Sequence, residues 1–175
     1  MKAKYCRESR VVRTSRVFQN DVNSHNTLFG GRLMSDIDQV ASITALRHSR
    51  TDCVTASTDS VDFLYPIRTT DAVCFESYVT WAGTSSIEVF VKVIAEDLKS
   101  GERKMAATAL LTFVALDKEQ CPTRVPEVIP ETDEEKKLNE TAPERARMRK
   151  ERKSKSKELS VFYTTTIPGI DKVYS

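Results

Sequence analysis

Hydrophobic and polar positions alternate along the chain with two periods, that of a β-strand and that of an α-helix. A strand-like segment comes first, then a helical one, then further strand-like segments. Residues 11–18 place apolar side chains among polar ones as a strand does, and a dense cluster of turn formers follows at residues 20–26. From about Gly31 to Arg47 the spacing becomes helical. One helical stripe holds Leu33, Ile37, Val40 and Thr44, and its neighbour holds Met34, Asp38, Ala41 and Ala45. A strand, a loop of defined shape and one long helix are therefore predicted.

Four further segments have the features of β-strands, namely residues 53–65, 72–81, 87–93 and 104–116. Short connections separate the last three strands, and connections of this kind join antiparallel neighbours. One strand, one helix and four strands predict an α+β fold in which a long helix is wrapped by a five-stranded antiparallel sheet. The edges of such a sheet are exposed and are usually paired away, so we expect a homo-oligomer in which two sheets join edge to edge.

The C-terminal third is polar and carries its charge unevenly. A main domain is expected over residues 1–121, followed by an extended linker with spaced prolines at 122–130 and a charged helix over 131–158 that is interrupted at Pro143. Residues 159–175 show no clear period and stay unassigned. The segment 144–157 holds eight bases and two acids. Such a run is either a solvated helix or a contact for an anionic ligand, including the phosphates of a nucleotide.

Length and composition exclude several classes of protein. The 175 residues suit one domain with a single core, and the net charge is only +2. No apolar run approaches the roughly 18 residues that a membrane helix needs, so no membrane association is expected. The N-terminal residues are polar and contain no signal core, which predicts a cytoplasmic protein.

The four cysteines and two histidines argue against a metal site. The cysteines are widely spaced and form no Cys-x-x-Cys pair, and the histidines lie far from any cluster of ligands. We therefore expect ordinary thiols in a reducing compartment and no bound metal. The residues concerned are Cys6, Cys53, Cys74, Cys121, His25 and His48.

The first candidate for chemistry is the glycine pair Gly30-Gly31 at the start of the predicted helix. Glycine lets a ligand approach the backbone closely, and the first helical turn offers unpaired N–H donors at the positive end of the helix dipole. Such donors can stabilise a developing oxyanion. Taken alone, the pair favours a tight turn that binds nothing, because glycine pairs are common.

The second candidate is Asp38, two turns into the helix on a half-apolar stripe. Aspartate is unfavourable inside a helix and is rarely buried without a partner, so this carboxylate is a candidate base or nucleophile. The alternative is a solvent-facing side chain at the edge of the stripe. Asp36 is expected to be solvated. Asn23 offers an amide donor or simply forms the turn, and His25 is expected to be a loop histidine without a catalytic part.

The segment from Asn23 to Asp38, continued by Gln39-Val40-Ala41, resembles the corresponding segment of hotdog-fold acyl-CoA thioesterases. This branch includes brain acyl-CoA hydrolase and many bacterial acyl-CoA hydrolases. Residues 54–67, 83–87 and 107–117 resemble later landmarks of the family in the same order, and residues 144–147 resemble the C-terminal helix of bacterial members. The resemblance implies the hotdog fold and the hydrolysis of fatty acyl-CoA to free fatty acid and CoA.

The resemblance also implies roles for individual residues. Asp38 matches the catalytic aspartate and Asn23 the catalytic asparagine, and in the family these two come from opposite protomers. In some relatives the asparagine lies nearer the glycine pair, where this chain has Thr27. The N–H groups near Gly30 and Gly31 would polarise the thioester carbonyl, and Thr55 would line the same site.

The substrate and the assembly follow from the same resemblance. Serine hydroxyls and arginines are suitable partners for the phosphates of CoA, although the arginines are equally compatible with a solvated helix. These candidates are Ser85, Ser86, Arg145, Arg147 and Arg149. No metal or organic cofactor is needed. A dimer is expected at least, and a trimer of dimers as in bacterial relatives.

Two other functions compete with this interpretation. A hotdog acyl-CoA hydratase or dehydratase would be expected to place a histidine in the site, and only His25 is near. A non-catalytic acyl-CoA-binding regulator would lack the carboxylate or add a DNA-binding segment, whereas Asp38 is present and no helix-turn-helix pattern precedes Val11. Nucleic-acid binding is therefore not expected, although the basic run leaves it open to a salt-dependent binding assay.

Overall fold

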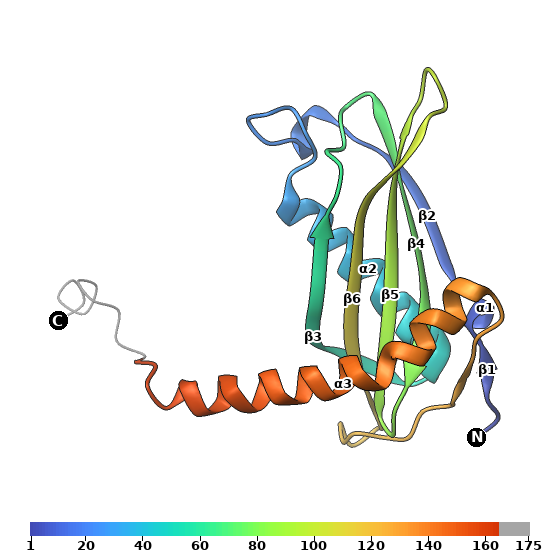
Figure 1. Cartoon of the computed structure of the whole chain (residues 1–175), viewed down its shortest axis with the longest axis vertical. Helices are drawn as coiled ribbons and strands as arrows, with labels where there is room; N and C mark the ends of the chain where they lie inside the picture. Colours follow the sequence, from blue (N-terminus) through green and yellow to red (C-terminus); the bar gives the residue numbers. More distant parts are fainter. Residues whose placement is uncertain (165–175) are drawn as a thin grey trace. The chain divides into compact units, whose positions relative to one another are not determined.

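A computed structural model describes residues 1–164 of the chain, which divide into two compact units, Met1–Ala142 and a second that begins at Pro143. In chain order the elements are β1 (Lys4–Tyr5), α1 (Cys6–Ser9), β2 (Val11–Arg16), the 3-10 helix η1 (Gln19–Asp21), α2 (Gly30–Ser49), β3 (Asp52–Phe63), β4 (Asp71–Ala82), β5 (Ser86–Asp97), β6 (Arg103–Leu116), β7 (Val128–Ile129) and α3 (Asp133–Ser160) (Figure 1).

Five antiparallel strands form one sheet in the order β2-β4-β5-β6-β3, and α2 runs along one face of it (Figure 1). The predicted α+β architecture, a long helix against a five-stranded antiparallel sheet, is confirmed. The predicted strand at residues 53–65 is β3, which lies at an edge of the sheet next to β6. In the part of the chain that the structure describes, no strand pairs with the outer side of β3.

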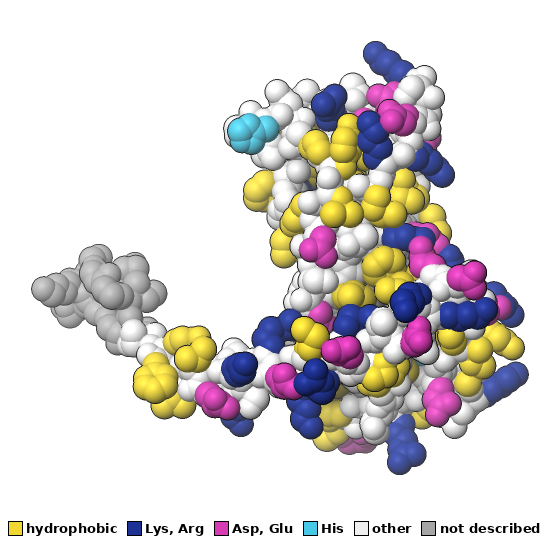
Figure 2. Space-filling model, viewed as in Figure 1, with side chains coloured by type: hydrophobic (Ala, Val, Ile, Leu, Met, Phe, Trp, Pro, Cys, Tyr) yellow, Lys and Arg dark blue, Asp and Glu magenta, His cyan; other side chains and the backbone are white. Residues whose placement is uncertain are grey.

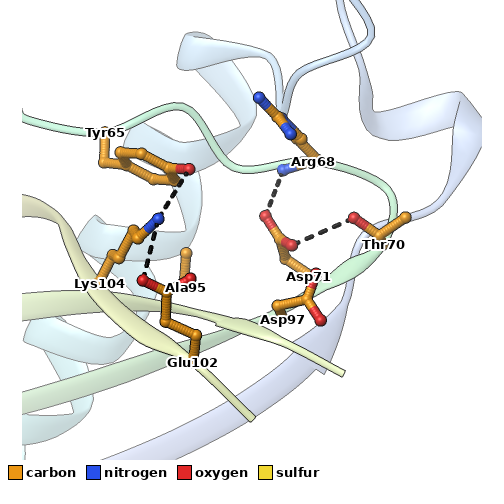
Figure 3. A pocket seen from close by; sticks show the side chains of 8 residues that line it. All are labelled: Tyr65, Arg68, Thr70, Asp71, Ala95, Asp97, Glu102 and Lys104. Atoms are coloured by element: carbon orange, nitrogen blue, oxygen red, sulfur yellow. Dashed lines mark hydrogen bonds and ion pairs between the residues drawn. The ribbon is translucent and has the colours of Figure 1, made fainter. Parts of the chain in front are cut away.

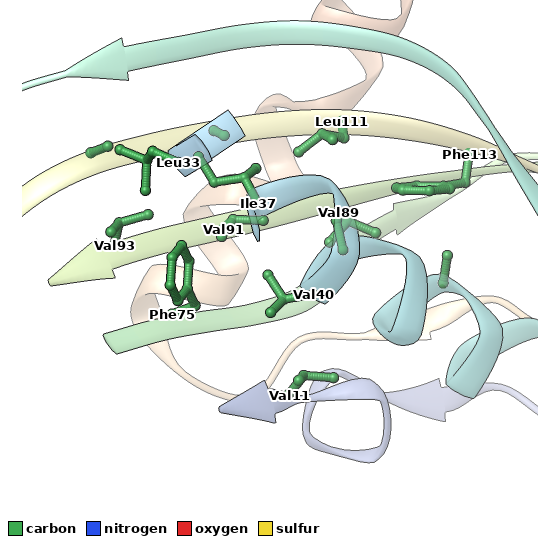
Figure 4. Packing of buried hydrophobic residues seen from close by; sticks show 14 of the residues in the cluster. Val11, Leu33, Ile37, Val40, Phe75, Val89, Val91, Val93, Leu111 and Phe113 are labelled. Atoms are coloured by element: carbon green, nitrogen blue, oxygen red, sulfur yellow. The ribbon is translucent and has the colours of Figure 1, made fainter. Parts of the chain in front are cut away.

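The core lies between α2 and the sheet (Figure 4). The predicted helical stripe points into it, with Leu33, Ile37 and Val40 almost fully buried. The helix contacts apolar side chains that alternate along β4, β5 and β6, and each fully buried side chain of this size contributes about 1.5–3 kcal/mol. The polar member of the stripe, Thr44, is also buried, and its hydroxyl shares a 2.6 Å hydrogen bond with that of Ser77.

The two ends of α2 are held differently. At the C-terminus Arg50 adopts a left-handed conformation (φ 62°), and its N–H donates to the Leu46 carbonyl. The Lys4 ammonium donates to the carbonyl of His48 at 2.5 Å, where a positive charge complements the helix dipole. At the N-terminus Phe29 is extended, and no side chain of the described residues caps the helix.

The segment after β6 packs onto the sheet and does not simply link two bodies. Val125 and Ala142 are buried, and the first compact unit extends from Met1 to Ala142. The Tyr78 hydroxyl donates to Glu134, and the Asn139 amide donates to the Thr80 carbonyl at 2.7 Å. Tyr78 and Thr80 alternate with the core-facing residues of β4, so the first turns of α3 cover the sheet face opposite α2.

Helix α3 continues through Pro143, where an interruption was predicted. A proline inside a helix removes one N–H from the hydrogen-bond ladder and can bend the helix without ending it. The second unit begins at this residue, and in it Arg147 pairs with Glu151 at 2.7 Å, one turn away. Residues 165–175, most of the unassigned tail, lie outside the described residues. Over the described range no helix is both long and apolar enough to cross a membrane.

Candidate active site

A small hairpin precedes α2 and positions Asn23. Val22 and Leu28 form an antiparallel bridge, and Thr27 forms another with Arg68. At the tip, the N–H of Asn23 donates to the Thr27 carbonyl at 2.9 Å, and Asn26 takes the left-handed conformation (φ 57°) that asparagine tolerates well. The turn formers of this loop therefore give it a defined shape, as predicted, and that shape is a small hairpin.

The side chain of Asn23 is hydrogen-bonded within its own loop. Its Oδ1 accepts from the backbone N–H of His25 at 2.9 Å and from that of Thr27 at 3.3 Å. The Thr27 hydroxyl lies 3.2 Å from Oδ1 and 3.0 Å from Nδ2. The turn-forming role and a role as amide donor are compatible, because the turn uses mainly the oxygen. His25 is exposed and takes part through its backbone only.

The glycine pair opens α2 directly after this hairpin. The N–H of Phe29 donates to the Asp21 carbonyl at 2.8 Å, which leaves the first helical turn to begin at Gly30. A Cβ atom on Gly31 would lie only 2.6 Å from the Phe29 ring, so the ring would have to move if any other residue replaced this glycine. The uncapped start of the helix presents unpaired N–H donors at its positive end.

A groove of about 480 Å³ adjoins these donors. Polar groups at one side come from Asn23, Thr27 and Gly30. The remaining wall is mostly apolar and is formed by Leu28, Leu33, Phe63, Leu64, Tyr65, Pro66 and Ile67. An apolar groove with a few polar groups at one end suits a ligand that has an apolar chain attached to a polar reacting centre.

Asp38 does not line this groove. Its half-buried carboxylate accepts a 2.9 Å hydrogen bond from the Thr55 hydroxyl on β3. The structure therefore brings the two predicted residues Asp38 and Thr55 together. A hydroxyl that donates to one oxygen fixes the carboxylate while its other oxygen remains available for chemistry.

Asp36 is buried, with 6% of its surface exposed, and the expectation that it would be solvated is wrong. Its carboxylate pairs with Arg13 of β2 at 2.6 Å and with Arg32 at 3.2 Å. Arg32 also lies 3.6 Å from Asp21, and the Arg13 guanidinium stacks over the Phe75 ring at 4.8 Å. This network connects β2, the first turns of α2 and the loop that carries Asn23.

The predicted CoA contacts lie elsewhere. Ser86 is paired with Val114 of β6, and Val114 with Val54 of β3. Side chains paired in this way point to the same face of the sheet, and Val54 points away from the face on which its neighbour Thr55 contacts Asp38. Ser86 therefore lies on the sheet face opposite α2 and Asp38. Ser85 precedes it in the β4–β5 connection, whose end of the sheet lies opposite the Gly30 end of α2 (Figure 1). The predicted tail arginines belong to the second unit. They are Arg145, Arg147 and Arg149.

Large apolar side chains remain exposed along the edge strand β3 and the adjacent side of α2. Figure 2 shows hydrophobic side chains at the upper part of the edge of the first unit, near the end of β3 in Figure 1. The exposed residues of β3, of the loop after it and of this side of α2 include Met34, Leu46, Val54, Phe63 and Leu64, of which Leu64 is 58% exposed. An unpaired strand edge beside an apolar helix side is typical of a surface that another chain covers.

A smaller pocket of about 160 Å³ next to the groove is polar (Figure 3). The Lys104 ammonium stacks over the Tyr65 ring at 4.7 Å and pairs with Glu102 at 3.2 Å. Asp71 accepts hydrogen bonds from the N–H of Arg68 and the hydroxyl of Thr70. These polar groups pair with one another, so the apolar groove is the better candidate for the reacting part of a ligand.

The other ionisable groups of note have structural roles. His48 is completely buried, its Nε2 lies 2.8 Å from the Pro126 carbonyl, and burial lowers the pKa of its ring. Burial, with Glu135 nearby, raises the pKa of the Cys6 thiol to about 12 and makes it unreactive. Among residues 1–164 no group of three or more His, Cys, Asp or Glu side chains is arranged to hold a metal ion.

Comparison with known proteins agrees with this geometry. Residues 25–102 match the thioesterase superfamily. A protein of Bacillus subtilis named as an uncharacterized acyl-CoA thioester hydrolase is 62% identical over 165 residues, which is 94% of this chain and 96% of that protein. The rat cytosolic acyl coenzyme A thioester hydrolase is 38% identical over 120 residues, which is 67% of this chain and 32% of the rat protein.

Solved structures show the same similarity. The crystal structure of an acyl-CoA hydrolase from Bacillus cereus has a TM-score of 0.90 and 56% identity, and the match covers 93% of this chain and 99% of that one. An acyl-CoA hydrolase from Staphylococcus aureus, in complex with butyryl coenzyme A, coenzyme A and coenzyme A disulfide, has a TM-score of 0.88 and 46% identity, with 91% and 98% covered. The chain therefore belongs to the thioesterase superfamily, among the acyl-CoA hydrolases with a hotdog fold.

Proposed function

We propose that the protein hydrolyses fatty acyl-CoA to free fatty acid and CoA, with Asn23, Asp38 and Thr55 in its active site. The observation that carries this assignment is the sequence spacing between the three residues. Three variants of the S. aureus hydrolase were crystallised in which an asparagine, an aspartate or a threonine is replaced by alanine. The first two are fifteen residues apart and the last two seventeen, the same intervals that separate Asn23, Asp38 and Thr55 here.

The start of α2 supplies the electrophilic half of the mechanism. The backbone N–H groups at Gly30 and Gly31 donate to the thioester carbonyl and stabilise the negative charge that develops on its oxygen. The Asn23 amide, which lines the same groove, adds a side-chain donor. One oxyanion donor of this kind typically contributes about 10²–10³ in rate.

Asp38 supplies the nucleophilic half, by one of two routes. As a general base it removes a proton from water, the water oxygen attacks the carbonyl carbon, and the carbon–sulfur bond breaks to release CoA, whose thiolate takes up the proton. As a nucleophile its oxygen forms a mixed anhydride and expels the CoA thiolate, and water then cleaves the anhydride. In both routes the Thr55 hydroxyl orients the carboxylate. Neither route uses a metal or an organic cofactor.

The site is formed by two chains in this proposal. Asn23 and Gly30 line the groove of one protomer, Asp38 is not part of that groove, and the exposed side of α2 and β3 lies between protomers. An edge-to-edge dimer brings the groove of one chain to the Asp38 carboxylate of the other. A hexameric acyl-CoA thioesterase with a TM-score of 0.85 and 41% identity supports a trimer of such dimers.

Ser85, Ser86 and the arginines Arg145, Arg147 and Arg149 remain our candidates for the phosphates of CoA. Ser85 and Ser86 lie away from Gly30 in their own chain. They can therefore bind CoA phosphates only at a site whose Gly30 belongs to another chain of the oligomer. We further propose that the protein acts in the cytoplasm.

The test is a thiol-release assay with an acyl-CoA series from short to long chains. The wild-type protein should release CoA, and Asp38→Asn should lose most turnover with an unchanged melting curve. Asp133→Asn, at a fully exposed aspartate, is the matched control and should keep its activity. Hydration of an enoyl-CoA without thiol release would instead favour the hydratase.

A further inference from the structure

The oxygen of the Asn23 side chain is already used by its own loop. Two backbone N–H groups, those of His25 and Thr27, point at this atom, and only an oxygen can accept from both. A carbonyl oxygen has two lone pairs, so these two bonds satisfy it. The part of Asn23 that remains for a ligand is the amide NH₂, which can only donate.

The Thr27 hydroxyl holds the NH₂ end of that amide. It lies 3.0 Å from Nδ2 and 3.2 Å from Oδ1, so it contacts both ends of the amide. Among the described residues it is the one side chain that is hydrogen-bonded to the Asn23 side chain. The amide carries two hydrogens, of which the Thr27 hydroxyl accepts one, and the second stays available.

The backbone around both residues is fixed independently of this contact. The Val22–Leu28 and Thr27–Arg68 bridges hold the hairpin, and the Asn26 N–H donates to the Asn23 carbonyl at 3.0 Å. Loss of the Thr27 hydroxyl therefore removes the contact that holds the Nδ2 end of the amide, while the hairpin and the two backbone hydrogen bonds to Oδ1 remain. Both residues line the groove together with Gly30.

We propose that Thr27 is a positioning residue, which orients the Asn23 amide as a hydrogen-bond donor toward the reacting thioester. The inference rests on the proposed function and extends it in two ways. Asn23 acts as a donor and never as a base, and its action depends on the hydroxyl of a residue that does not itself touch the reacting atoms.

The experiment compares Thr27→Val with Thr27→Ser in the thiol-release assay. Valine keeps the branched shape of threonine and lacks the hydroxyl, whereas serine keeps the hydroxyl. Because a misplaced catalytic group costs up to about 100-fold in rate, we expect kcat to fall about tenfold or more in Thr27→Val with KM nearly unchanged, and to return largely in Thr27→Ser. Thr14→Val, at an exposed threonine of β2, is the matched control.

A double-mutant cycle gives the readout that a purely structural role would not produce. If Thr27 acts through Asn23, Thr27→Val should cause no further loss of kcat in the Asn23→Ala background. Equal losses in both backgrounds would overturn the inference, as would a Thr27→Val enzyme with normal kcat. A melting curve is recorded for each variant, and Thr27→Ala replaces Thr27→Val if valine prevents folding.

Failure of this inference is distinguishable from failure of the proposed function. If the wild-type protein releases no CoA from any acyl-CoA, the proposed function is wrong. If the wild-type protein turns over and Asn23→Ala is as active as wild type, Asn23 is not a donor in the site, and the inference is wrong while the activity stands.

Discussion

Replacing Asp36 by alanine removes the anion that holds two arginines at the start of α2, and we expect a clear loss of stability. The Asp36 carboxylate is 8% exposed, whereas Arg13 is 33% and Arg32 is 55% exposed. Removing one partner of a fully buried ion pair costs about 3–5 kcal/mol, and an exposed pair contributes about 0.2–1 kcal/mol. Because Arg13 is one-third exposed, we expect a loss between these limits, of about 2 kcal/mol.

For a chain of this length, 1 kcal/mol corresponds to about 2–4 °C in melting temperature, so Asp36→Ala should melt about 4–8 °C below wild type. The measurement is a thermal melt at fixed protein concentration, because the melting temperature of an oligomer depends on concentration. Arg32→Gln removes the more exposed arginine and should cost less than about 1 kcal/mol.

The reasoning also predicts a loss of activity beyond the loss of stability. The network reaches Asp21, whose carbonyl holds Phe29 immediately before the glycine pair. Asp36→Ala should therefore lower kcat even at a temperature where the variant is fully folded. A variant that melts within about 1 °C of wild type, or Arg32→Gln that melts as low as Asp36→Ala, would refute the account of this network.

Two further predictions concern pH and assembly. Burial lowers the pKa of His48 below its ordinary 6.5, so at mildly acidic pH the unfolded chain binds a proton that the folded protein does not. The stabilising contribution of the neutral ring should therefore be complete above pH 6.5 and decrease below it. Between about pH 7.5 and 5.5 the urea midpoint of His48→Gln should change less than that of the wild-type protein. Val54→Glu, at a 48% exposed residue of the edge strand β3, should shift the protein to smaller species in sedimentation and abolish activity, whereas Val12→Glu, at a 63% exposed residue on the opposite edge strand β2, should change neither. An active Val54→Glu monomer would contradict the two-chain site.

The elements of the fold could be predicted from the sequence because each depends on a local period. Leu33, Ile37 and Val40 repeat at helical spacing, and the structure buries all three. The same local reasoning missed Asp36, because its partner Arg13 lies on another strand, and a carboxylate looks solvated until that partner is known. Alternation likewise places Glu88 on the polar side of β5, yet it is 1% exposed, and the Thr80 hydroxyl donates to it at 2.8 Å.

The candidate site was predictable as a list of residues and not as an arrangement. The glycine pair and Asp38 stand out because their residue types are unusual at the start and in the middle of a helix. The pairing of Asp38 with Thr55 depends on how β3 lies beside α2, which no local period encodes. Thr27 was considered only as the residue that replaces an asparagine of some relatives, and its contact with Asn23 depends on the turn geometry at Asn26.

The central claim is that one site uses Asn23 and Asp38 from different chains, and mixing two inactive variants tests it most directly. Asn23→Ala and Asp38→Ala are combined in equal amounts after subunit exchange, and differently tagged subunits confirm the exchange. Random exchange makes about half of the dimers mixed, each with one site that lacks both groups and one that retains both. The account predicts that about a quarter of wild-type activity returns. No recovery despite confirmed exchange would contradict it, because a site built from one chain lacks one group in every combination.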